Sequence, residues 1–298
     1  MLKHTFRNIS LLLLTFAISS CVTIPPEMQL VAMDVEMGQM QVQANCTHGN
    51  RTGFIKAGAR SESVLDTNRI SLINWNIYKG QRDNWASDFN KHIQQQDIVV
   101  IQEAVLKQEL YQALSAQQLH WSLNTAFYYE DAEAGVLTAS KVRALRSCGL
   151  RAKEPLIRIP KTILISEYRL SNSEHNLLVA NIHSINFTLG TGAYMQQIAS
   201  LANAIRHHEG PVIVAGDFNT WSDSRMGIVN QMAELLSLDA VTYKQHNRLM
   251  LFGNPLDHVF YRGLELIKEE TLEVTSSDHN PIKVTFRMPS SQLAGTEL

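Results

Sequence analysis

Polar side chains of the kinds that bind metals and phosphates stand where the apolar runs of this sequence end. They are Asn74 and Asn76 in NWNIYKG, Glu103 in VVIQEA, Asn181, His183 and Asn186 in VANIHSIN, Asp217 and Asn219 in VAGDFNTW, Asp257 and His258 in LDHVF, and Asp278 and His279 in SSDHNP. Each alone has an ordinary explanation, as a cap, a turn residue or a satisfied core histidine. Buried carboxylates, however, are costly unless they are paired or bound to a metal. Their repeated occurrence at strand ends therefore indicates one shared site.

The donor types in this set determine the metal that we expect. Four of the side chains offer amide or carboxylate oxygens: Asn76, Glu103, Asp217 and Asp278. Mg²⁺, Mn²⁺ and Ca²⁺ prefer such oxygens, whereas a zinc site is disfavoured because the sequence has no HExxH and no pair of metal-spaced cysteines. The sequence also has no GxSxG and no P-loop, so serine hydrolysis and NTP-driven chemistry have no support. Metal-assisted attack of water on a phosphate ester fits the set.

The elements that must position these residues alternate along the chain. Apolar runs predict strands at 69–77, 97–104, 121–129, 135–140, 161–170, 176–187, 211–219, 256–264, 264–274 and 281–288. Helical spacing or composition predicts helices at 85–96, 106–119, 193–208 and 224–238. The polar turn SNSEHN joins two of the runs into a predicted hairpin. So many strands, several in hairpins, exclude a doubly wound parallel sheet and favour two stacked mixed sheets with helices outside.

Composition bounds the class of protein. The chain has 298 residues, of which 45% are hydrophobic and 18% charged, so it is globular. Its net charge of -2 argues against coating nucleic acid by bulk electrostatics. One stretch, 141–161, is nevertheless basic, with Lys141, Arg143, Arg146, Arg151, Lys153, Arg158 and Lys161 against the single acid Glu154. It could form a track for a phosphate backbone, or a solvated strand face or a patch against anionic lipid.

Residues 1–20 have the pattern of a signal peptide. Lys3 and Arg7 precede an apolar stretch that is too short to span a bilayer. The tetrapeptide that ends at Cys21 resembles a bacterial lipobox, although Ile and Ser replace its commonest residues. We therefore expect lipidation of Cys21 and a lipid-anchored protein of the bacterial cell envelope that faces the periplasm. A secreted or soluble periplasmic protein, or an uncleaved anchor, is the alternative.

The rest of the chain divides into three parts. We expect a tether and lead-in at 21–67, one domain at 68–288 and a loose tail at 289–298. Cys46 and Cys148 remain beside Cys21, and in an oxidising periplasm they either pair or stay as separate thiols.

Taken together, the strand-end blocks resemble a known group of proteins. NWNIYKG, IQEA, NIHSINF, AGDFNTWS, LDHVFYRG and SDHNPI follow the order and spacing of the endonuclease/exonuclease/phosphatase superfamily over about residues 68–288. NIHSINFTLG and GDFNTWS are similar to the motifs of a poorly characterised bacterial subgroup. The resemblance implies the DNase I-like fold, an α/β protein built as a four-layer α/β/β/α sandwich of two mixed, mainly antiparallel sheets. It also implies metal-dependent cleavage of phosphate esters.

The same resemblance implies ligands for metal and phosphate. Asn76 and Glu103 hold a divalent metal, with Asp278 as a third ligand. Mg²⁺ is the expected ion, with Mn²⁺ or Ca²⁺ as alternatives. His183 and Asn186 lie in the block whose side chains face the scissile phosphate.

Four further residues receive roles around the attacking water. Asp217 positions or deprotonates the water, with Asn219 beside it. His279 contacts the phosphate as a base or charge stabiliser and is oriented by Asp257. A carboxylate partner raises the pKa of an imidazole, so we expect His279 to stay cationic.

The substrate stays open, because one catalytic core serves nucleases, phosphoinositide phosphatases and sphingomyelinase-like lipases in this superfamily. The alternatives are a nucleic acid, a phospholipid head group or small phosphate ester, and a non-catalytic module, which the complete set of blocks disfavours. We expect a monomer that meets membranes through its lipid anchor. A membrane-lytic lipase should have an exposed aromatic hairpin. NTAFYYEDAE is the one candidate segment, and its two tyrosines are more typical of a sheet.

Overall fold

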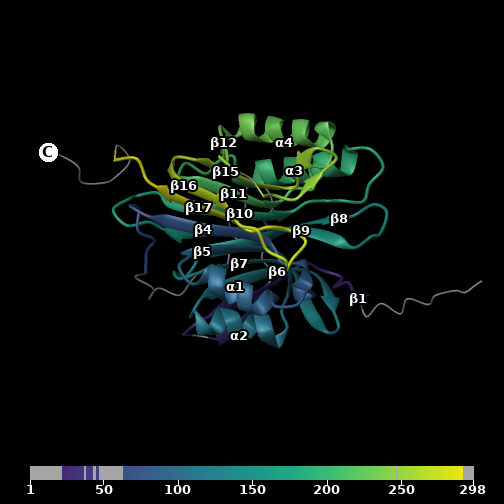
Figure 1. The fold of residues 1–298 in the computed structure, drawn as a ribbon, viewed down its shortest axis with the longest axis horizontal. Coiled ribbons are helices and arrows are strands. Elements are labelled where there is room, and N and C mark those ends of the chain that lie inside the picture. Colours follow the sequence, from purple (N-terminus) through teal and green to yellow (C-terminus); the bar gives the residue numbers. More distant parts are fainter. Residues whose placement is uncertain (1–21, 37, 43–44, 47–62, 246, 291–298) are drawn as a thin grey trace, which may run out of the picture.

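Two stacked β-sheets and four helices form the domain (Figure 1). The computed structural model describes residues 22–36, 38–42, 45–46, 63–245 and 247–290. Helices α1 (Trp85–Ile93) and α2 (Gln108–Ala116) cover the outer face of one sheet, and α3 (Gly192–Ile205) and α4 (Asp223–Leu235) cover the outer face of the other. The expected four-layer α/β/β/α sandwich is therefore confirmed.

The larger sheet has the order β16-β17-β4-β5-β7-β6-β2-β3, with β1 paired to β6. Its strands are β1 (Val22–Thr23), β2 (Gln29–Asp34), β3 (Gly38–Val42), β4 (Ile70–Asn76), β5 (Ile98–Val105), β6 (His120–Tyr129), β7 (Ala132–Ser140), β16 (Glu265–Thr271) and β17 (Ile282–Arg287). Only β4 and β5 run parallel within it; the other pairs are antiparallel. A short 3₁₀ turn, η2 (Tyr78–Gly80), follows β4.

The smaller sheet has the order β12-β15-β11-β10-β9-β8. Its strands are β8 (Arg146–Lys153), β9 (Pro160–Arg169), β10 (Asn176–His183), β11 (Val212–Asp217), β12 (Asp239–Ala240) and β15 (Asp257–Arg262). Here β10 and β11 are the parallel pair, and β9 and β10 form the hairpin predicted around SNSEHN. A separate hairpin joins β13 (Met250–Leu251) to β14 (Asn254–Pro255).

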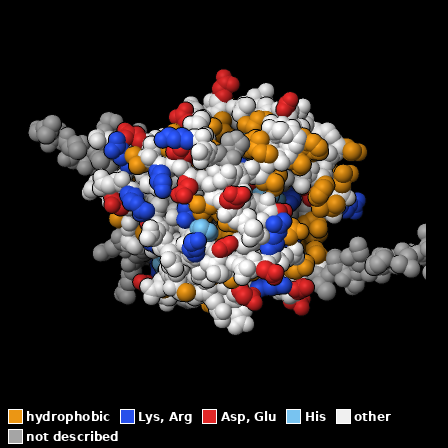
Figure 2. Space-filling view, viewed as in Figure 1, with side chains coloured by type: hydrophobic (Ala, Val, Ile, Leu, Met, Phe, Trp, Pro, Cys, Tyr) orange, Lys and Arg blue, Asp and Glu red, His pale blue; other side chains and the backbone are white. Residues whose placement is uncertain are grey.

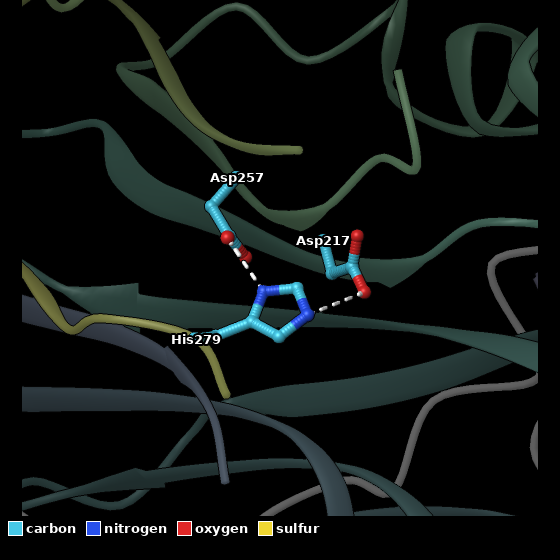
Figure 3. Close-up of side chains that lie close together, drawn as sticks. All are labelled: Asp217, Asp257 and His279. Carbon is cyan, nitrogen blue, oxygen red and sulfur yellow. Dashed lines mark hydrogen bonds and ion pairs between the residues drawn. The ribbon is translucent and has the colours of Figure 1, made fainter. Parts of the chain in front are cut away.

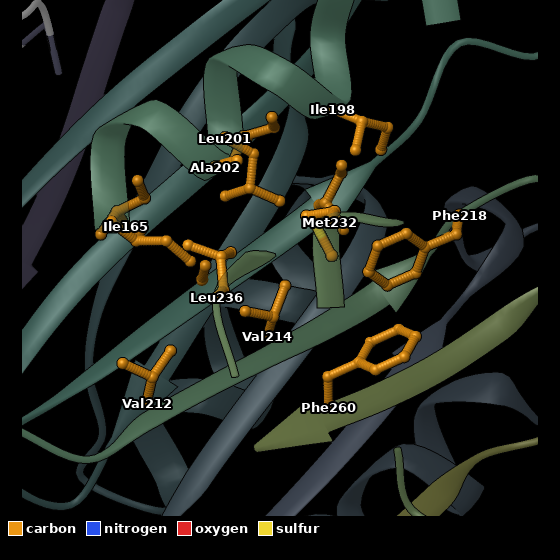
Figure 4. Packing of buried hydrophobic residues seen from close by; sticks show 14 of the residues in the cluster. Ile165, Ile198, Leu201, Ala202, Val212, Val214, Phe218, Met232, Leu236 and Phe260 are labelled. Carbon is orange, nitrogen blue, oxygen red and sulfur yellow. The ribbon is translucent and has the colours of Figure 1, made fainter. Parts of the chain in front are cut away.

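Strands that are buried on both faces explain the continuous apolar runs of the sequence. Along β5, Val100 points into the layer between the sheets, where it packs with Val179 and Ile213, whereas Ile101 joins the core under α1 and α2. The same division holds on the other side, where Ile198 of α3 packs in a cluster with Val214 of β11 (Figure 4).

Part of the segment expected to be a tether is instead strand. β2 pairs with β6 from Gln29 opposite Thr125 to Met33 opposite Trp121, and its Leu30 is fully buried. The pairing covers an edge of β6 that would otherwise expose unpaired backbone groups. The folded unit therefore begins well before residue 68. The predicted signal peptide at 1–20, Cys21 and residues 291–298 of the predicted tail lie outside the described residues.

Cys46 and Cys148 form a disulfide that links this N-terminal part to β8. The sequence left open whether these two cysteines pair or stay as separate thiols, and in the structure they pair. No helix among the described residues combines the length and the apolar character that a membrane crossing requires.

A buried polar network crosses the interface between the two sheets. The Gln102 amide donates to Asn74 Oδ1 at 2.9 Å within its own sheet and to Asn181 Oδ1 at 2.8 Å in the facing sheet. Asn181 in turn donates to the carbonyl of Leu137 at 2.9 Å. Asn74 and Asn181, which the sequence placed among the possible ligands, are therefore structural residues behind the site.

Candidate active site

Two parallel strand pairs bring the candidate residues to one edge of the sandwich. Asn76 ends β4 and lies opposite Gln102 of β5, so Glu103 is the next residue beyond that pair. In the facing sheet, His183 at the end of β10 lies opposite Asp217 at the end of β11, and Asp217 also lies opposite Asp257 of β15. The carboxyl ends of parallel strands share an edge, which is where such folds build binding sites.

The Asp217 carboxylate lies at the centre of the group. Its Oδ2 accepts a hydrogen bond from Asn76 Nδ2 at 3.1 Å and lies 3.5 Å from His183 Nε2 and 3.9 Å from His279 Nε2. Its Oδ1 accepts the backbone N–H of Asn219 at 3.0 Å. Burial raises the pKa of Asp217 to about 6, although the charge on His279 opposes the shift. A carboxylate that titrates near neutral pH is suited to accept a proton from water.

His279 and Asp257 form the expected pair (Figure 3). The imidazole Nδ1 donates to Asp257 Oδ2 at 2.7 Å, and both side chains are buried. Burial by itself lowers the pKa of His279, but Asp257 and then Asp217 outweigh it and raise the pKa to about 10. His279 is therefore an imidazolium at neutral pH, with its Nε2–H directed toward Asp217.

Two hydrogen bonds fix the loop that carries His279 onto strand β4, and a third lies within the loop. The Trp75 indole donates to the His279 carbonyl at 2.9 Å, and the Ser277 hydroxyl donates to the Asn76 carbonyl at 2.7 Å. Ser277 Oγ also accepts the His279 backbone N–H at 3.2 Å. Asp278, between them, is only half-buried, and its Oδ1 lies 3.4 Å from Ser277 Oγ.

Glu103 stands at a β-bulge. The register of β5 against β7 shifts between Ile101 and Ala104, and Glu103 has a positive φ of 52°. Such bulges redirect a side chain at the end of a strand, and an unusual φ in a non-glycine residue is typical of functional positions. The Glu103 carboxylate pairs with Lys79 Nζ. Burial alone would raise the pKa of Glu103, but Lys79 brings it below its ordinary value.

A lysine that the sequence assigned only to the basic stretch belongs to the site. Lys161 Nζ donates to His183 Nε2 at 2.8 Å. Burial lowers the pKa of His183 well below its ordinary value, and the nearby charge of Lys161 lowers it further. His183 is therefore neutral at pH 7 and carries its proton on Nδ1. Burial also lowers the pKa of Lys161, against the opposing charge of Glu103.

Asn186 and Asn219 form the frame around this centre. Asn186 Oδ1 accepts the Trp221 indole N–H at 2.9 Å, and Asn219 Nδ2 donates to the Ser184 carbonyl at 3.0 Å. The buried guanidinium of Arg225 donates to the backbone carbonyls of both asparagines, at 2.8 and 3.0 Å. Trp221 therefore holds the Asn186 amide in place.

The residues fit a divalent metal at the ends of β4 and β5. Asn76 Oδ1 accepts one hydrogen bond from the described residues, the Tyr78 backbone N–H at 3.1 Å, and keeps a lone pair, while Glu103 stays ionised. An amide oxygen and a carboxylate are suitable ligands for Mg²⁺ or Mn²⁺. Within the described residues, Asp278 forms no hydrogen bond or ion pair with either side chain.

A second group of possible ligands is better explained as an ion-pair cluster. Ligand atoms of Asp217, Asp257 and His279 lie within 4.8 Å of one another. His279 is protonated, however, and its Nδ1 is already bonded to Asp257. An imidazolium has no lone pair for a metal.

Glu103, Lys161 and His183 of the site also line a cleft of about 190 Å³. One part of its wall is charged or polar, formed by Lys79, Glu103, Glu154, Lys161, Thr162 and His183. The other part is largely apolar, formed by Val105, Ala126, Phe127, Ala134, Gly135, Ile157, Ile159, Pro160 and Phe187. The cleft therefore offers an apolar surface directly beside the charged centre.

The basic stretch 141–161 does not form a continuous phosphate track. Arg143 is buried in ion pairs with Asp34 and Glu36, and Arg146 pairs with Glu167 at 2.6 Å. Lys141 pairs with Asp97, and Arg151 donates to the carbonyls of Pro25 and Glu27. Lys161 donates to His183. Lys153 and Arg158 are the exposed members that form no ion pair among the described residues.

A four-layer sandwich that gathers amide, carboxylate and imidazole groups at one edge is the arrangement of phosphate-ester hydrolases with the DNase I-like fold. The model of the Endonuclease/Exonuclease/phosphatase family matches residues 73–279, and the chain therefore belongs to this family. Its members are typically hydrolases of phosphate esters and commonly use divalent metal ions.

Other proteins are similar to this chain in sequence or in fold. A UPF0294 protein of Vibrio campbellii (strain ATCC BAA-1116) is 39% identical over 233 residues, which cover 77% of this chain and 82% of that protein. The human Nocturnin catalytic domain with bound sulfate has a TM-score of 0.59 at 15% identity and covers 78% of this chain and 100% of its own. D. rerio TDP2 complexed with single strand DNA product has a TM-score of 0.53 at 17% identity and covers 74% of this chain and 99% of its own. At these identities the solved structures establish the fold alone.

Proposed function

We propose that this protein is a divalent-metal-dependent phosphodiesterase that hydrolyses its substrate by in-line attack of water. One observation carries the proposal: the Asp217 carboxylate faces Asn76, His183 and His279, and His279 is held by its ion pair with Asp257. These are the groups that in-line hydrolysis requires, a proton acceptor beside fixed positive charge and neutral donors.

Each residue has a role that follows from its charge. Asp217 accepts a proton from the attacking water, since its pKa of about 6 leaves it mostly ionised at pH 7. The His279 imidazolium offsets the negative charge that develops on the phosphate oxygens, and Lys161 adds a second positive charge beside His183. A Mg²⁺ or Mn²⁺ ion held by Asn76 and Glu103, with Asp278 as a further candidate ligand, would supply Lewis-acid stabilisation of the phosphate.

Nucleic acid is the first candidate substrate, which makes the protein an endonuclease. The fold that it shares with D. rerio TDP2, whose structure was solved with a single strand DNA product, is consistent with this candidate. Most basic side chains in 141–161 are paired within the protein, so this stretch no longer supports a nucleic-acid substrate. A polynucleotide would have to be held by the cleft itself, with Lys79 and Lys161 as its phosphate contacts.

A phospholipid head group or a small phosphate ester is the second candidate. The specific observation in its favour is the apolar wall of the cleft, which includes Phe127, Ile159 and Phe187. An apolar wall beside a phosphate centre suits a substrate that carries an apolar group next to its phosphate. A binding module without catalysis is the weakest alternative, because the site retains its acid, imidazole and amide groups.

A substrate panel tests the reaction and separates the candidates. The purified chain is assayed with Mg²⁺ or Mn²⁺ on plasmid DNA, single-stranded RNA, sphingomyelin vesicles and bis-(p-nitrophenyl) phosphate. Asp217→Asn should abolish every activity found, whereas Asp239→Asn, the same change at an exposed position on β12, should leave it intact. Activity that survives in Asp217→Asn, or no activity on any member of the panel, would refute the proposal.

The location and the assembly of the protein are further proposals. We propose a lipid-anchored monomer in the bacterial cell envelope that faces the periplasm, with Cys21 as the lipidated residue. The disulfide between Cys46 and Cys148 supports an oxidising compartment. Incorporation of labelled palmitate into the wild type but not into Cys21→Ser tests the anchor, and light scattering of the purified chain tests the monomer.

A further inference from the structure

Two connections beside the cleft expose large apolar side chains to solvent. Between β8 and β9, Leu156 is 55% exposed and Ile157 is 46% exposed; between β10 and α3, Phe187 is 52% and Leu189 is 86% exposed. We call these four residues the apolar rim. Figure 2 shows hydrophobic side chains gathered along the right side of the molecule, where β8 and β1 lie in Figure 1. An exposed apolar cluster of this kind indicates contact with an apolar partner.

The two connections that carry the apolar rim are joined to each other and border the cleft. The buried carboxylate of Glu154 accepts the backbone N–H groups of Asn186 and Phe187, the latter at 2.7 Å, and so joins the two connections. Ile157 and Phe187 line the same cleft as His183. Any surface that covers the apolar rim is therefore brought to the mouth of the site.

Positive charge flanks the apolar rim. Lys153 and Arg158 bracket Leu156 and Ile157 in the sequence, and both are exposed. Neither forms an ion pair with an acidic side chain in the part of the chain that the structure describes. Apolar side chains between unpaired basic ones suit a lipid surface with anionic head groups, which attract the charges while the apolar groups insert.

The chain enters the domain next to the apolar rim. Val22 of β1 pairs with Tyr129 of β6, the strand whose Phe127 lines the cleft, and the Arg151 guanidinium of β8 donates to the Pro25 carbonyl at 2.8 Å. The 21 residues before Val22 contain the apolar stretch of the expected signal. A membrane anchor at this end of the chain would hold the apolar rim, rather than the opposite side of the domain, toward the bilayer.

We propose that the apolar rim inserts into the surface of an anionic lipid bilayer and holds the mouth of the cleft against it. The docking does not depend on the reaction. Its consequence, that a phosphodiester carried by a lipid reaches the site directly from the bilayer, rests on the proposed function.

The position of a single side chain relative to the bilayer tests the docking. The full chain is reconstituted in vesicles of phosphatidylcholine and phosphatidylglycerol, with a nitroxide on Leu189→Cys or, as a matched control, on Leu235→Cys, which is 71% exposed on α4. The unsubstituted chain serves as the labelling blank. We expect the label at 189 to be accessible to oxygen and shielded from a water-soluble nickel chelate, and the label at 235 to show the reverse. Equal exposure of both labels to the chelate overturns the proposal, as does a label at 189 shielded from both reagents, which indicates a protein partner.

A second measurement separates docking from catalysis. Leu156→Asp and Leu189→Asp together should lower hydrolysis of a vesicle-borne phosphodiester at least about tenfold, because each charge opposes insertion of a side chain. Hydrolysis of soluble bis-(p-nitrophenyl) phosphate should be unchanged, and Leu235→Asp should alter neither. Equal losses on both substrates would overturn the docking proposal. If the unsubstituted chain hydrolyses neither substrate, the proposed function fails while the nitroxide result still decides the docking.

Discussion

Replacing Asp257 by asparagine tests the charge on His279 while keeping the shape of the pair. Asp257 and, next, Asp217 raise the pKa of His279 from 6.5 to about 10. At 1.36 kcal/mol per pKa unit, this displacement corresponds to about 5 kcal/mol between the two protonation states. Asp217 remains 3.9 Å from His279 Nε2 in the variant, so it retains part of this energy. We expect the pKa of His279 to fall by roughly two units.

The assay is the pH profile of kcat/KM on bis-(p-nitrophenyl) phosphate at saturating Mg²⁺. In the unsubstituted protein the acid limb should lie near pH 6, where Asp217 becomes protonated, and the alkaline limb near pH 10, where His279 loses its proton. Asp257→Asn should move the alkaline limb toward neutral pH. It should also lower kcat/KM at pH 7 by about tenfold to a hundredfold, because an amide orients the imidazole less firmly.

Stability should change with pH in a defined direction. The folded pKa of His279 lies above its unfolded value of 6.5, so the ion pair contributes its full stability below pH 6.5 and loses it as the pH rises toward about 10. Urea unfolding at pH 6.5 and at pH 10 should therefore show that the free energy of unfolding of the unsubstituted protein falls across this range. The fall should be smaller in Asp257→Asn. Asp239→Asn is the control. An alkaline limb that stays in place, with kcat/KM within about twofold of the original, would refute this account of His279.

Three other changes have expected outcomes. Lys161→Met should lower kcat about tenfold or more, because the site loses a fixed positive charge. Steady-state kinetics measures this loss, and circular dichroism checks that the variant is folded. An unchanged kcat would show that Lys161 does not take part in the reaction. Cys148→Ser opens a crosslink of sequence separation 102 and should lower the free energy of unfolding by about 2–5 kcal/mol, which urea titration detects. A chelator should abolish hydrolysis, and added Mg²⁺ or Mn²⁺ should restore it. Glu103→Gln should raise the metal concentration that gives the half-maximal rate. Hydrolysis that continues in the presence of a chelator would contradict the metal site.

The fold was largely predictable because buried strands leave apolar runs that are easy to find. The hairpin of β9 and β10 and the four helices lie where periodicity indicates them. The strands β1 to β3 were missed for a physical reason. β1 has only two residues, β3 contains two glutamines, and the three strands are held by pairing with β6 or with one another, so their own sequence carries a weak signal.

The candidate site was predictable where parallel strands end, and less so elsewhere. Asn76, His183, Asp217, Asp257 and His279 do converge. Their individual roles, and those of Glu103, Asp278, Asn186 and Asn219, remain predictions.

Two kinds of residue escaped this reasoning. Lys161 stands at the start of β9, which runs antiparallel to β10, so the beginning of one strand meets the end of the other at His183. Asn74 and Asn181 each precede a site residue by two positions, and the alternation of a strand places them on the same face but deeper between the sheets.

The place of β4 in the sheet has a consequence for synthesis. This strand carries Asn76 between β5 and β17, and β17 is the last strand that the structure describes. His279, on the loop just before β17, is fixed by the Trp75 indole at the other end of the domain's sequence. A nascent chain therefore lacks both a neighbour for β4 and the imidazolium of the site until residues 279–287 have been added. A product truncated before His279 lacks the ion pair with Asp257 on which the proposed hydrolysis depends, so we expect it to be inert.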